Sequence, residues 1–408
     1  MDGDPAVEPE LDSFSLTFPL PYRVAFIIIL AVWGWGVNLH FLTRRGIDVP
    51  SLVRYPGRTS SSQLPHHLST YRLAAFLSIT SALSIVTFWL FSHRDPNLVI
   101  YYDWIPMTNL LVLAVLFALP LRGLSVSHTG RSRLLWTLRR VSIGGLAEAK
   151  DGKFGDILLA DVLTSYAKVM GDLFVCLCMF LTRNGSATDR PDRSCGGKVL
   201  VPLILAVPSA IRLRQCLIEF LRVRRAPSKS TGWGGQHLAN AAKYSTAFPV
   251  IVLSALMRNL GSDQGTTTGL YRAWLVACMV NSFYSFYWDV AKDWDLTLFS
   301  DARERNAPDH PFGLRRRLLI HKPAVYYAVI VVDLLLRCTW SLKLSPHLDH
   351  ITDFESSIFV IQFLEVFRRW MWIFFRVETE WIRNTSTGPG LDGMLLGNLG
   401  GDRYEDED

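Results

Sequence analysis

The chain has 408 residues, half of them hydrophobic, with a formal net charge of +6 and a mean hydropathy of +0.21. Its apolar residues form runs of roughly 18 to 25 residues, the length that a helix needs to cross a bilayer, whereas a soluble core has short amphipathic stripes. Most Lys and Arg residues lie in loops between these runs, which argues against a nucleic-acid partner. The sequence therefore predicts an all-α, polytopic transmembrane helical bundle.

About nine spans are predicted after an acidic N-terminal segment, residues 1–21, that lacks the basic region of a cleaved signal peptide. We expect Pro202 and Pro208 to kink the fifth span. The Gly-rich tail at 385–408, with its acidic end, is expected to be disordered. The spans cover about residues 22–42, 72–92, 101–121, 155–182, 199–221, 240–260, 270–291, 323–343 and 356–377.

The charge of the loops predicts the orientation. Arginine clusters follow the first, third, fifth and seventh spans, whereas the loops around 93–100, 261–269 and 344–355 are nearly free of Lys and Arg. Basic loops stay in the cytosol, so we expect a lumenal N-terminus and a cytosolic C-terminus. The loop 183–198 is then lumenal, and its sequon at Asn184 is a candidate glycosylation site.

The cysteines predict neither a disulfide framework nor a zinc site. Five of the six lie in or beside predicted spans, and only Cys195 lies in a long polar loop. We interpret Cys176 and Cys178 as residues that pack against lipid or the core, and we predict no metal.

Charged residues inside the apolar runs mark the predicted functional site, because a charge near the bilayer centre costs at least a few kcal/mol and normally faces a polar interior. In the fourth span Asp161, Ser165, Lys168 and Asp172 recur on one helical face, with structural pairing between helices as the alternative. For Lys243, at the start of the sixth span, snorkelling to the interface is an equal alternative.

Arginines in the last two spans favour an anion as the transported ion. Arg337 interrupts the eighth span, and the ninth contains Glu365, Arg368 and Arg369, so the acid can neutralise one arginine within its own helix. The other arginine remains available. Arginine forks bind phosphate, sulfate or carboxylate oxygens bidentately, and nearby acids keep an anion from binding too tightly.

Three ordered motifs resemble the EXS family: Ser285 to Leu296, Asp333 to Trp340, and Leu364 to Trp370. The likeness covers roughly residues 154–384, and it implies a phosphate path through the last six predicted spans. Residues 22–153 then form an N-terminal three-span region. One departure is Asp161-Val-Leu-Thr164, where the family's exporters tend to have Asp-x-x-Asn. The residues implied for the path are Asp161, Lys243, Tyr244, Asp289, Asp293, Arg337, Trp340, Glu365, Arg368 and Arg369.

Only about twenty residues precede the first span, so the chain looks like the short, ER-retention-defective branch of this family, which lacks the SPX domain and belongs to the Golgi. The resemblance implies transport of inorganic phosphate from the Golgi lumen to the cytosol, recycling phosphate released by glycosylation and supporting retention of resident proteins. It implies no enzyme activity and no cofactor. Expected partners are inorganic phosphate and membrane lipid, and a homodimer is compatible with the sequence.

The alternative class is a trafficking factor whose basic loops and acidic tail recruit coat adaptors or Golgi glycosyltransferases, with the buried charges purely structural. A membrane-embedded transferase is disfavoured, because the sequence has no acidic metal-binding motif and no activated nucleophile.

Overall fold

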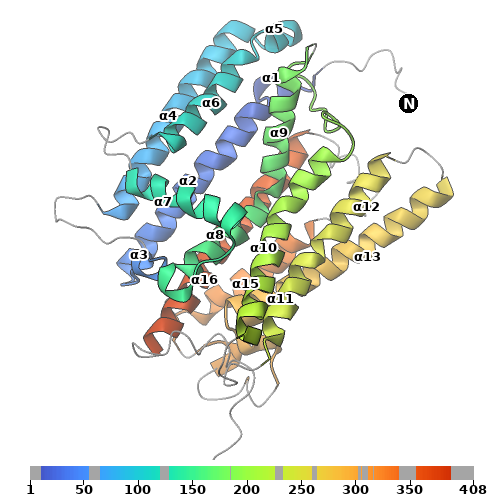
Figure 1. Ribbon diagram of the computed structural model, residues 1–408. Helices are drawn as coiled ribbons and strands as arrows, with labels where there is room; N and C mark the ends of the chain where they lie inside the picture. The colour runs from blue at the N-terminus through green and yellow to red at the C-terminus, as the bar shows by residue number, and fades with distance from the viewer. Residues whose placement is uncertain are drawn as a thin grey trace, which may run out of the picture.

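The regular structure of the chain is helical throughout the part that the computed structural model describes, and no strand occurs there (Figure 1). This confirms the predicted all-α fold class. The described residues are 11–54, 65–119, 128–183, 185–225, 233–259, 264–301, 305, 311–315, 317–339 and 355–386.

The N-terminal part of the chain forms one side of the bundle in Figure 1. Its long helices are α2 (Leu20–Arg44), α4 (His66–Ser92) and α6 (Trp104–Ala118). The short helix α7 (His128–Arg139) crosses toward the second side of the bundle and ends in a π-helical turn, Arg140–Gly144. The remaining short helices of this part are α1 (Ser13–Thr17), α3 (Val49–Leu52) and α5 (Pro96–Tyr101).

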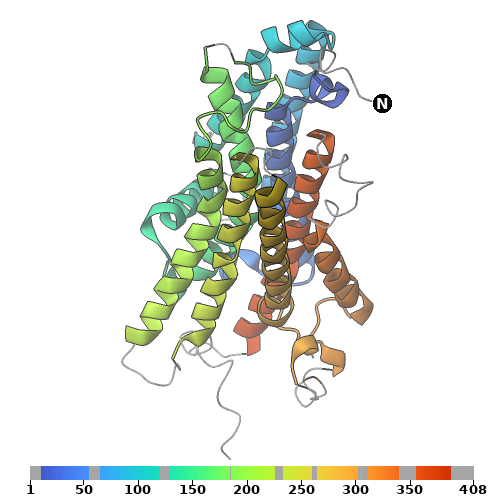
Figure 2. The ribbon, with the colours of Figure 1, turned by 90° about the vertical axis from the view of Figure 1, so that its right-hand side faces the viewer.

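The second side of the bundle contains the helices that carry most of the predicted site. The last of them, α16, contacts α2 as well as α8 and α15, and Figure 2 shows α16 (red) beside α2 (blue). The helices are α8 (Lys153–Ser165), α9 (Ala167–Leu181), α10 (Leu200–Arg225), α11 (Gly235–Ser245), α12 (Ala247–Asn259), α13 (Gln264–Trp288), α15 (Pro323–Arg337) and α16 (Glu355–Ser386). Short turns complete it: Ala149–Asp151, the π-helical Asp289–Asp293, Thr297–Phe299 and Pro311–Gly313.

A helix or a broken pair of helices occupies every predicted span. Among the described residues, four helical stretches are long and apolar enough to cross a membrane by themselves, namely α2, α4, the α5–α6 stretch Pro96–Ala118, and α10. The bent pair α8 and α9 raises this number to five. Of the other predicted spans, α15 is shorter, α16 carries Glu365, Arg368 and Arg369 of the site, and α13 is long enough but less apolar. The predicted span count and orientation therefore remain predictions.

Two predictions about single spans, the polar face of the fourth and the proline kinks of the fifth, can be compared with the structure. The fourth span is not one helix: α8 ends at Ser165, α9 begins at Ala167, and the two are bent by 62°. The single helical face predicted for Asp161 to Asp172 is therefore wrong. The fifth span runs as one helix through Pro208, and Pro202 falls in its first turn, where the backbone nitrogen needs no partner.

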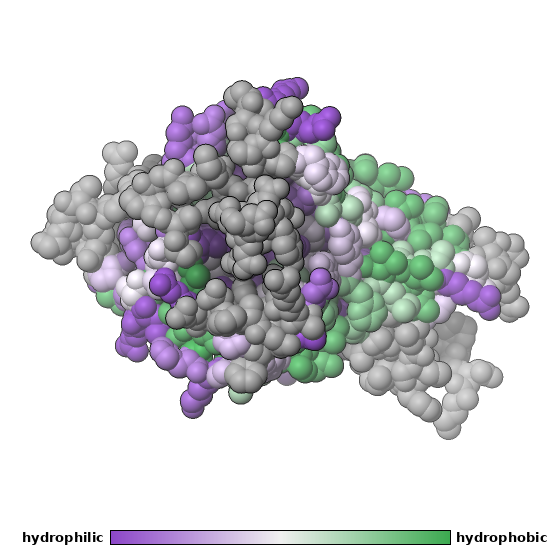
Figure 3. Space-filling view, turned by 90° about the horizontal axis from the view of Figure 1, so that it is seen from below, coloured by the Kyte–Doolittle hydropathy of each residue, from purple (hydrophilic) through white to green (hydrophobic). Residues whose placement is uncertain are grey.

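The outer surface of the bundle is apolar where lipid would contact it. Large hydrophobic side chains such as Leu83, Leu111 and Leu203 are more than half exposed. A hydrophobic flank is visible at the right of the view from below (Figure 3). Such an exposed apolar surface is unusual for a soluble monomer and is expected for a membrane protein.

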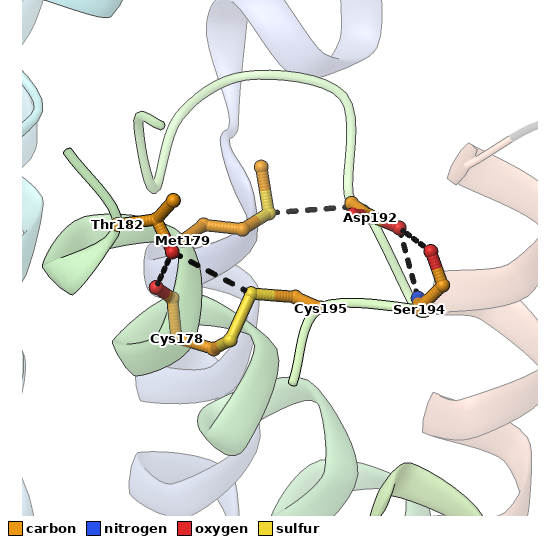
Figure 4. Close-up of a disulfide and its surroundings, with 6 residues drawn as sticks. All are labelled: Cys178, Met179, Thr182, Asp192, Ser194 and Cys195. Carbon is orange, nitrogen blue, oxygen red and sulfur yellow. Dashed lines mark hydrogen bonds between the residues drawn. A yellow bond between two sulfur atoms is a disulfide. The ribbon is translucent and has the colours of Figure 1, made fainter. Parts of the chain in front are cut away.

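A disulfide between Cys178 and Cys195 corrects the expectation that the cysteines form no such bond (Figure 4). Cys178 lies near the end of α9, and Cys195 lies in the loop that follows. Cys176 is fully buried in the core, as expected. Disulfides persist in oxidising compartments, so this bond agrees with the predicted lumenal position of the loop.

Candidate anion site

Charged side chains from α8, α10, α11, α15, α16 and the π-helical turn after α13 meet inside the bundle. The labels of most of these helices gather in the same part of Figure 1. We call this group the charge cluster. Its basic members are Arg212, Lys243, Arg337, Arg368 and Arg369, and its acidic members are Asp161, Asp289, Asp293, Asp333 and Glu365.

Asp289 is the centre of the cluster and is fully buried. Its Oδ1 lies 3.5 Å from Lys243 Nζ, and its Oδ2 lies 3.5 Å from Arg368 Nη1. Arg337 also donates through Nη2 to Asp289 Oδ2. This carboxylate therefore links α11, α15 and α16 through three cations.

Arg368 binds two further carboxylates. It donates to Glu365 through Nη2 at 2.6 Å and Nε at 3.0 Å, so the ion pair expected within α16 is confirmed. Its Nη1 lies 3.2 Å from Asp333 Oδ1. Asp333 also accepts from Arg337 Nε at 3.2 Å. Both arginines are thus neutralised by acids in this state.

Asp161 joins α8 to α10 and α11. Arg212 Nε donates to Asp161 Oδ1 at 2.6 Å, and the Tyr244 hydroxyl donates to the same oxygen. The guanidinium of Arg212 also lies over the Tyr244 ring, 4.8 Å from its centroid, and Nη1 donates to Gln215 at 2.6 Å. The alternative of structural pairing between helices therefore describes the immediate surroundings of Asp161.

Lys243 is buried, so its interpretation as a snorkelling residue is wrong. Its side chain is 7% exposed, and Nζ lies 3.5 Å from Asp289 and 3.6 Å from Asp293. The same ammonium lies over the ring of Trp288 at 5.9 Å. Asp293 Oδ2, although it faces Lys243, has no hydrogen-bond partner among the described residues.

Arg369 differs from the other arginines of the cluster because it has no carboxylate in ion-pair range within the described part of the chain. Nε donates to Ser165 Oγ at 2.8 Å, and Nη2 donates to Thr164 Oγ1 at 3.1 Å. The guanidinium stacks on Trp372, 4.6 Å from the ring centroid, and the residue is only 7% exposed. Its charge is therefore buried and oriented, with only neutral direct partners.

The backbone is irregular beside the cluster. The break between α8 and α9 follows Ser165 directly, and the break between α11 and α12 follows Lys243 and Tyr244 by one turn or less. Asp289 and Asp293 begin and end a π-helical turn, whereas a regular helix was predicted there. Irregular backbone at membrane depth occurs where it is buried in protein or lines a cavity.

Sequence reasoning located most of the cluster. It missed Arg212 and Asp333 as site residues, although a charge inside an apolar run was a usable signal for both. It placed Ser165 on the polar face of the fourth span but did not predict its contact with Arg369, and it gave Thr164 no role. Trp340 and the glycosylation candidate Asn184 lie outside the described residues. The predicted residues that the fold brings together are Asp161, Lys243, Tyr244, Asp289, Asp293, Arg337, Glu365, Arg368 and Arg369.

Comparison with known proteins gives consistent matches. The model of the EXS family matches residues 18–382. Protein ERD1 homolog 1 of Schizosaccharomyces pombe is 30% identical over 378 residues, which cover 92% of this chain and 94% of that protein. Protein ERD1 of Kluyveromyces lactis is 28% identical over 412 residues, covering 95% of this chain and 99% of the relative. Solute carrier family 53 member 1 of Mus terricolor is 28% identical over 399 residues, covering 93% of this chain and 53% of that carrier.

Proposed function

The chain belongs to the EXS family, and from this premise we propose that it carries inorganic phosphate across the Golgi membrane, from the lumen to the cytosol. Its relatives include a named solute carrier, which agrees with a transporter-like membrane protein and not with an enzyme. The charge cluster is the proposed binding site, because it offers arginine forks at the depth of the apolar helices.

The observation that carries this proposal is the state of Arg369. A buried guanidinium without a carboxylate partner is costly unless a ligand compensates for its charge. The hydroxyls of Ser165 and Thr164 orient it, and the carboxylates of Asp161, Asp289 and Glu365 act on its charge only from beyond ion-pair distance. An oxyanion that carries negative charge and presents several acceptor oxygens would satisfy the guanidinium, and phosphate fits its planar fork bidentately.

The acids of the cluster tune the site for release. Five basic groups face five acidic ones, so the site without its anion is close to neutral. Phosphate that binds Arg337 or Arg368 has to compete with Asp289, Asp333 and Glu365 for the same guanidinium groups. This competition keeps the affinity for phosphate low enough for the anion to leave, which conduction through a path requires.

We infer the direction and place of transport from the similarity to the ERD1 relatives, which this chain matches over almost their whole length. Glycosylation that uses sugar nucleotides leaves phosphate in the Golgi lumen, and its return to the cytosol would support further glycosylation and the retention of resident proteins. The Cys178–Cys195 disulfide supports a compartment boundary at the proposed lumenal end, because the bond requires an oxidising environment.

The test is a flux assay with purified protein in liposomes and labelled inorganic phosphate. We expect uptake above that of empty liposomes, and we expect Arg369→Lys to reduce it. Arg272→Lys, which changes an exposed arginine on α13, is the matched control and should leave uptake unchanged. If the wild type passes no phosphate while it folds and reaches the Golgi, the trafficking-factor alternative is favoured instead.

A further inference from the structure

A second group of charges, which we call the upper group, lies at the first residue of α16, ten residues before Glu365 of the charge cluster. Arg193 binds the carboxylate of Glu355 bidentately, with Nη1 2.8 Å from Oε1 and Nη2 3.1 Å from Oε2. Arg23 donates to the same carboxylate through Nη1 at 2.7 Å. Two guanidinium groups therefore converge on a single carboxylate.

The arginines of this group are held from separate parts of the chain. Arg23 lies in α2 and is 3% exposed. Its Nε donates to the Phe18 carbonyl at 2.8 Å, and its Nη2 donates to Ser15 Oγ at 2.7 Å. Glu355 is the first residue of α16. The geometry is thus built by α1, α2, α16 and the loop after α9, and does not depend on one flexible contact.

The disulfide holds the loop that supplies Arg193. Cys195 follows Arg193 by two residues and is bonded to Cys178 of α9 (Figure 4). Between them, Ser194 donates to Asp192 from its amide at 2.8 Å and from its hydroxyl at 2.5 Å, as Figure 4 also shows. These hydrogen bonds lower the pKa of the Asp192 carboxyl. The backbone on both sides of Arg193 is therefore restrained.

Polar residues connect this upper group to the charge cluster along α9 and α16. Asp172 of α9 is 5% exposed and lies close enough to Lys168, Arg193 and Arg23 to feel their charges. Gln362 of α16 is buried, and its Nε2 has no hydrogen-bond partner among the described residues. The chain rises about 15 Å over the ten residues from Glu355 to Glu365. An anion leaving the upper group would therefore meet polar groups on its way inward.

We propose that Arg23 and Arg193 form a second phosphate site at the predicted lumenal mouth, where the Glu355 carboxylate is a resident anion that phosphate displaces. The three cations Arg23, Arg193 and Lys168 face the acids Glu355, Asp172 and Asp12, so the two forks would be left with excess positive charge when the Glu355 carboxylate moves away. A fork that binds a carboxylate bidentately also fits phosphate. This inference rests on the proposed transport of phosphate.

The test compares two substitutions with opposite expectations. Arg193→Ala removes a fork, so the half-saturating concentration of phosphate on the lumenal face should rise about tenfold. Glu355→Gln removes the competing anion, so the same concentration should fall about tenfold. Arg190→Ala, an exposed arginine on the same loop, is the matched control. Cys195→Ser should behave like Arg193→Ala, because it releases the loop that positions this arginine.

The readouts separate this site from the proposed function. A merely structural ion pair predicts that Arg193→Ala and Glu355→Gln shift half-saturation in the same direction or not at all, and either result would overturn the site while transport by the wild type stands. Binding is measured separately as the increase in melting temperature that inorganic phosphate causes in purified protein. If the wild type shows no flux, the proposed function fails. The binding assay still tests the site, because Arg193→Ala should weaken phosphate binding and Glu355→Gln should strengthen it.

Discussion

Arg369→Lys should weaken phosphate binding strongly while it leaves the fold nearly intact. The substitution keeps the positive charge but loses the planar fork, and a hydrogen bond to a charged group contributes about 1.5–3 kcal/mol. Since about 1.4 kcal/mol corresponds to a factor of ten, we expect the half-saturating phosphate concentration to rise roughly 10- to 100-fold. Within the described part of the chain, the direct polar partners that lose a donor are the hydroxyls of Ser165 and Thr164, so the cost to stability should be about 1 kcal/mol.

Arg368→Gln provides the contrast, because it leaves Glu365 and Asp333 without their shared cation. Breaking a buried ion pair from one side costs about 3–5 kcal/mol, so this variant should melt at a clearly lower temperature. Both variants would be measured by phosphate flux in liposomes and by thermal unfolding in detergent. Wild-type half-saturation for Arg369→Lys at matched protein levels would refute the assignment of Arg369 as a phosphate ligand. Equal losses of thermal stability in the two variants would refute the conclusion that Arg368 is paired with carboxylates and Arg369 is not.

Three further predictions concern the acids, the orientation and the helix packing. Asp293→Asn and Glu365→Gln each remove a negative charge that competes with phosphate, so both variants should bind phosphate more tightly and transport it more slowly. Cells with either variant should then show raised lumenal phosphate and underglycosylation. Normal lumenal phosphate in correctly localised variants would favour the trafficking alternative. Protease added to intact Golgi vesicles should cleave the C-terminal tail, and protection of the tail would invert the topology. Gly34→Val should lower the free energy of unfolding by about 1–3 kcal/mol, because a Cβ at Gly34 would lie 2.7 Å from the Trp370 ring. Gly46→Val is the comparison variant: no atom lies within 4 Å of a Cβ at Gly46, so any loss of stability there comes from the positive φ and not from crowding.

Hydrophobic periodicity was sufficient to predict the fold class and the approximate place of each helix. Long apolar runs leave little choice in a bilayer, since a helix satisfies all backbone hydrogen bonds within one segment. The breaks were not predictable in the same way. Tyr166 interrupts the fourth span without a proline or glycine at the break, and the π-helical turn at Asp289–Asp293 has no sequence signature of its own. Both depend on packing against neighbouring helices.

The sequence was sufficient to predict site residues that are charged and lie inside apolar segments. It was not sufficient to predict which of these charges pair with one another. Arg337, Arg368 and Asp289 were identified because they interrupt hydrophobic segments or match a motif. Which arginine keeps a carboxylate partner depends on side-chain geometry across helices, so the contrast between Arg368 and Arg369 needed the structure. The disulfide was missed for the same reason, since Cys178 looked like a packing residue within its helix.

The irregular backbone and the charges occur together, and this coincidence argues for a site that changes its contacts. A structural ion-pair network is served best by straight helices, because their backbone groups need no other partners. Here the helices that supply Ser165, Lys243 and Asp289 are each interrupted within a turn of those residues. Interrupted helices free backbone dipoles and let the halves move separately, as in transporters whose substrates bind at discontinuous helices. A scaffold that only recruits partners has no use for this arrangement, whereas phosphate that must bind and leave requires contacts that can be exchanged.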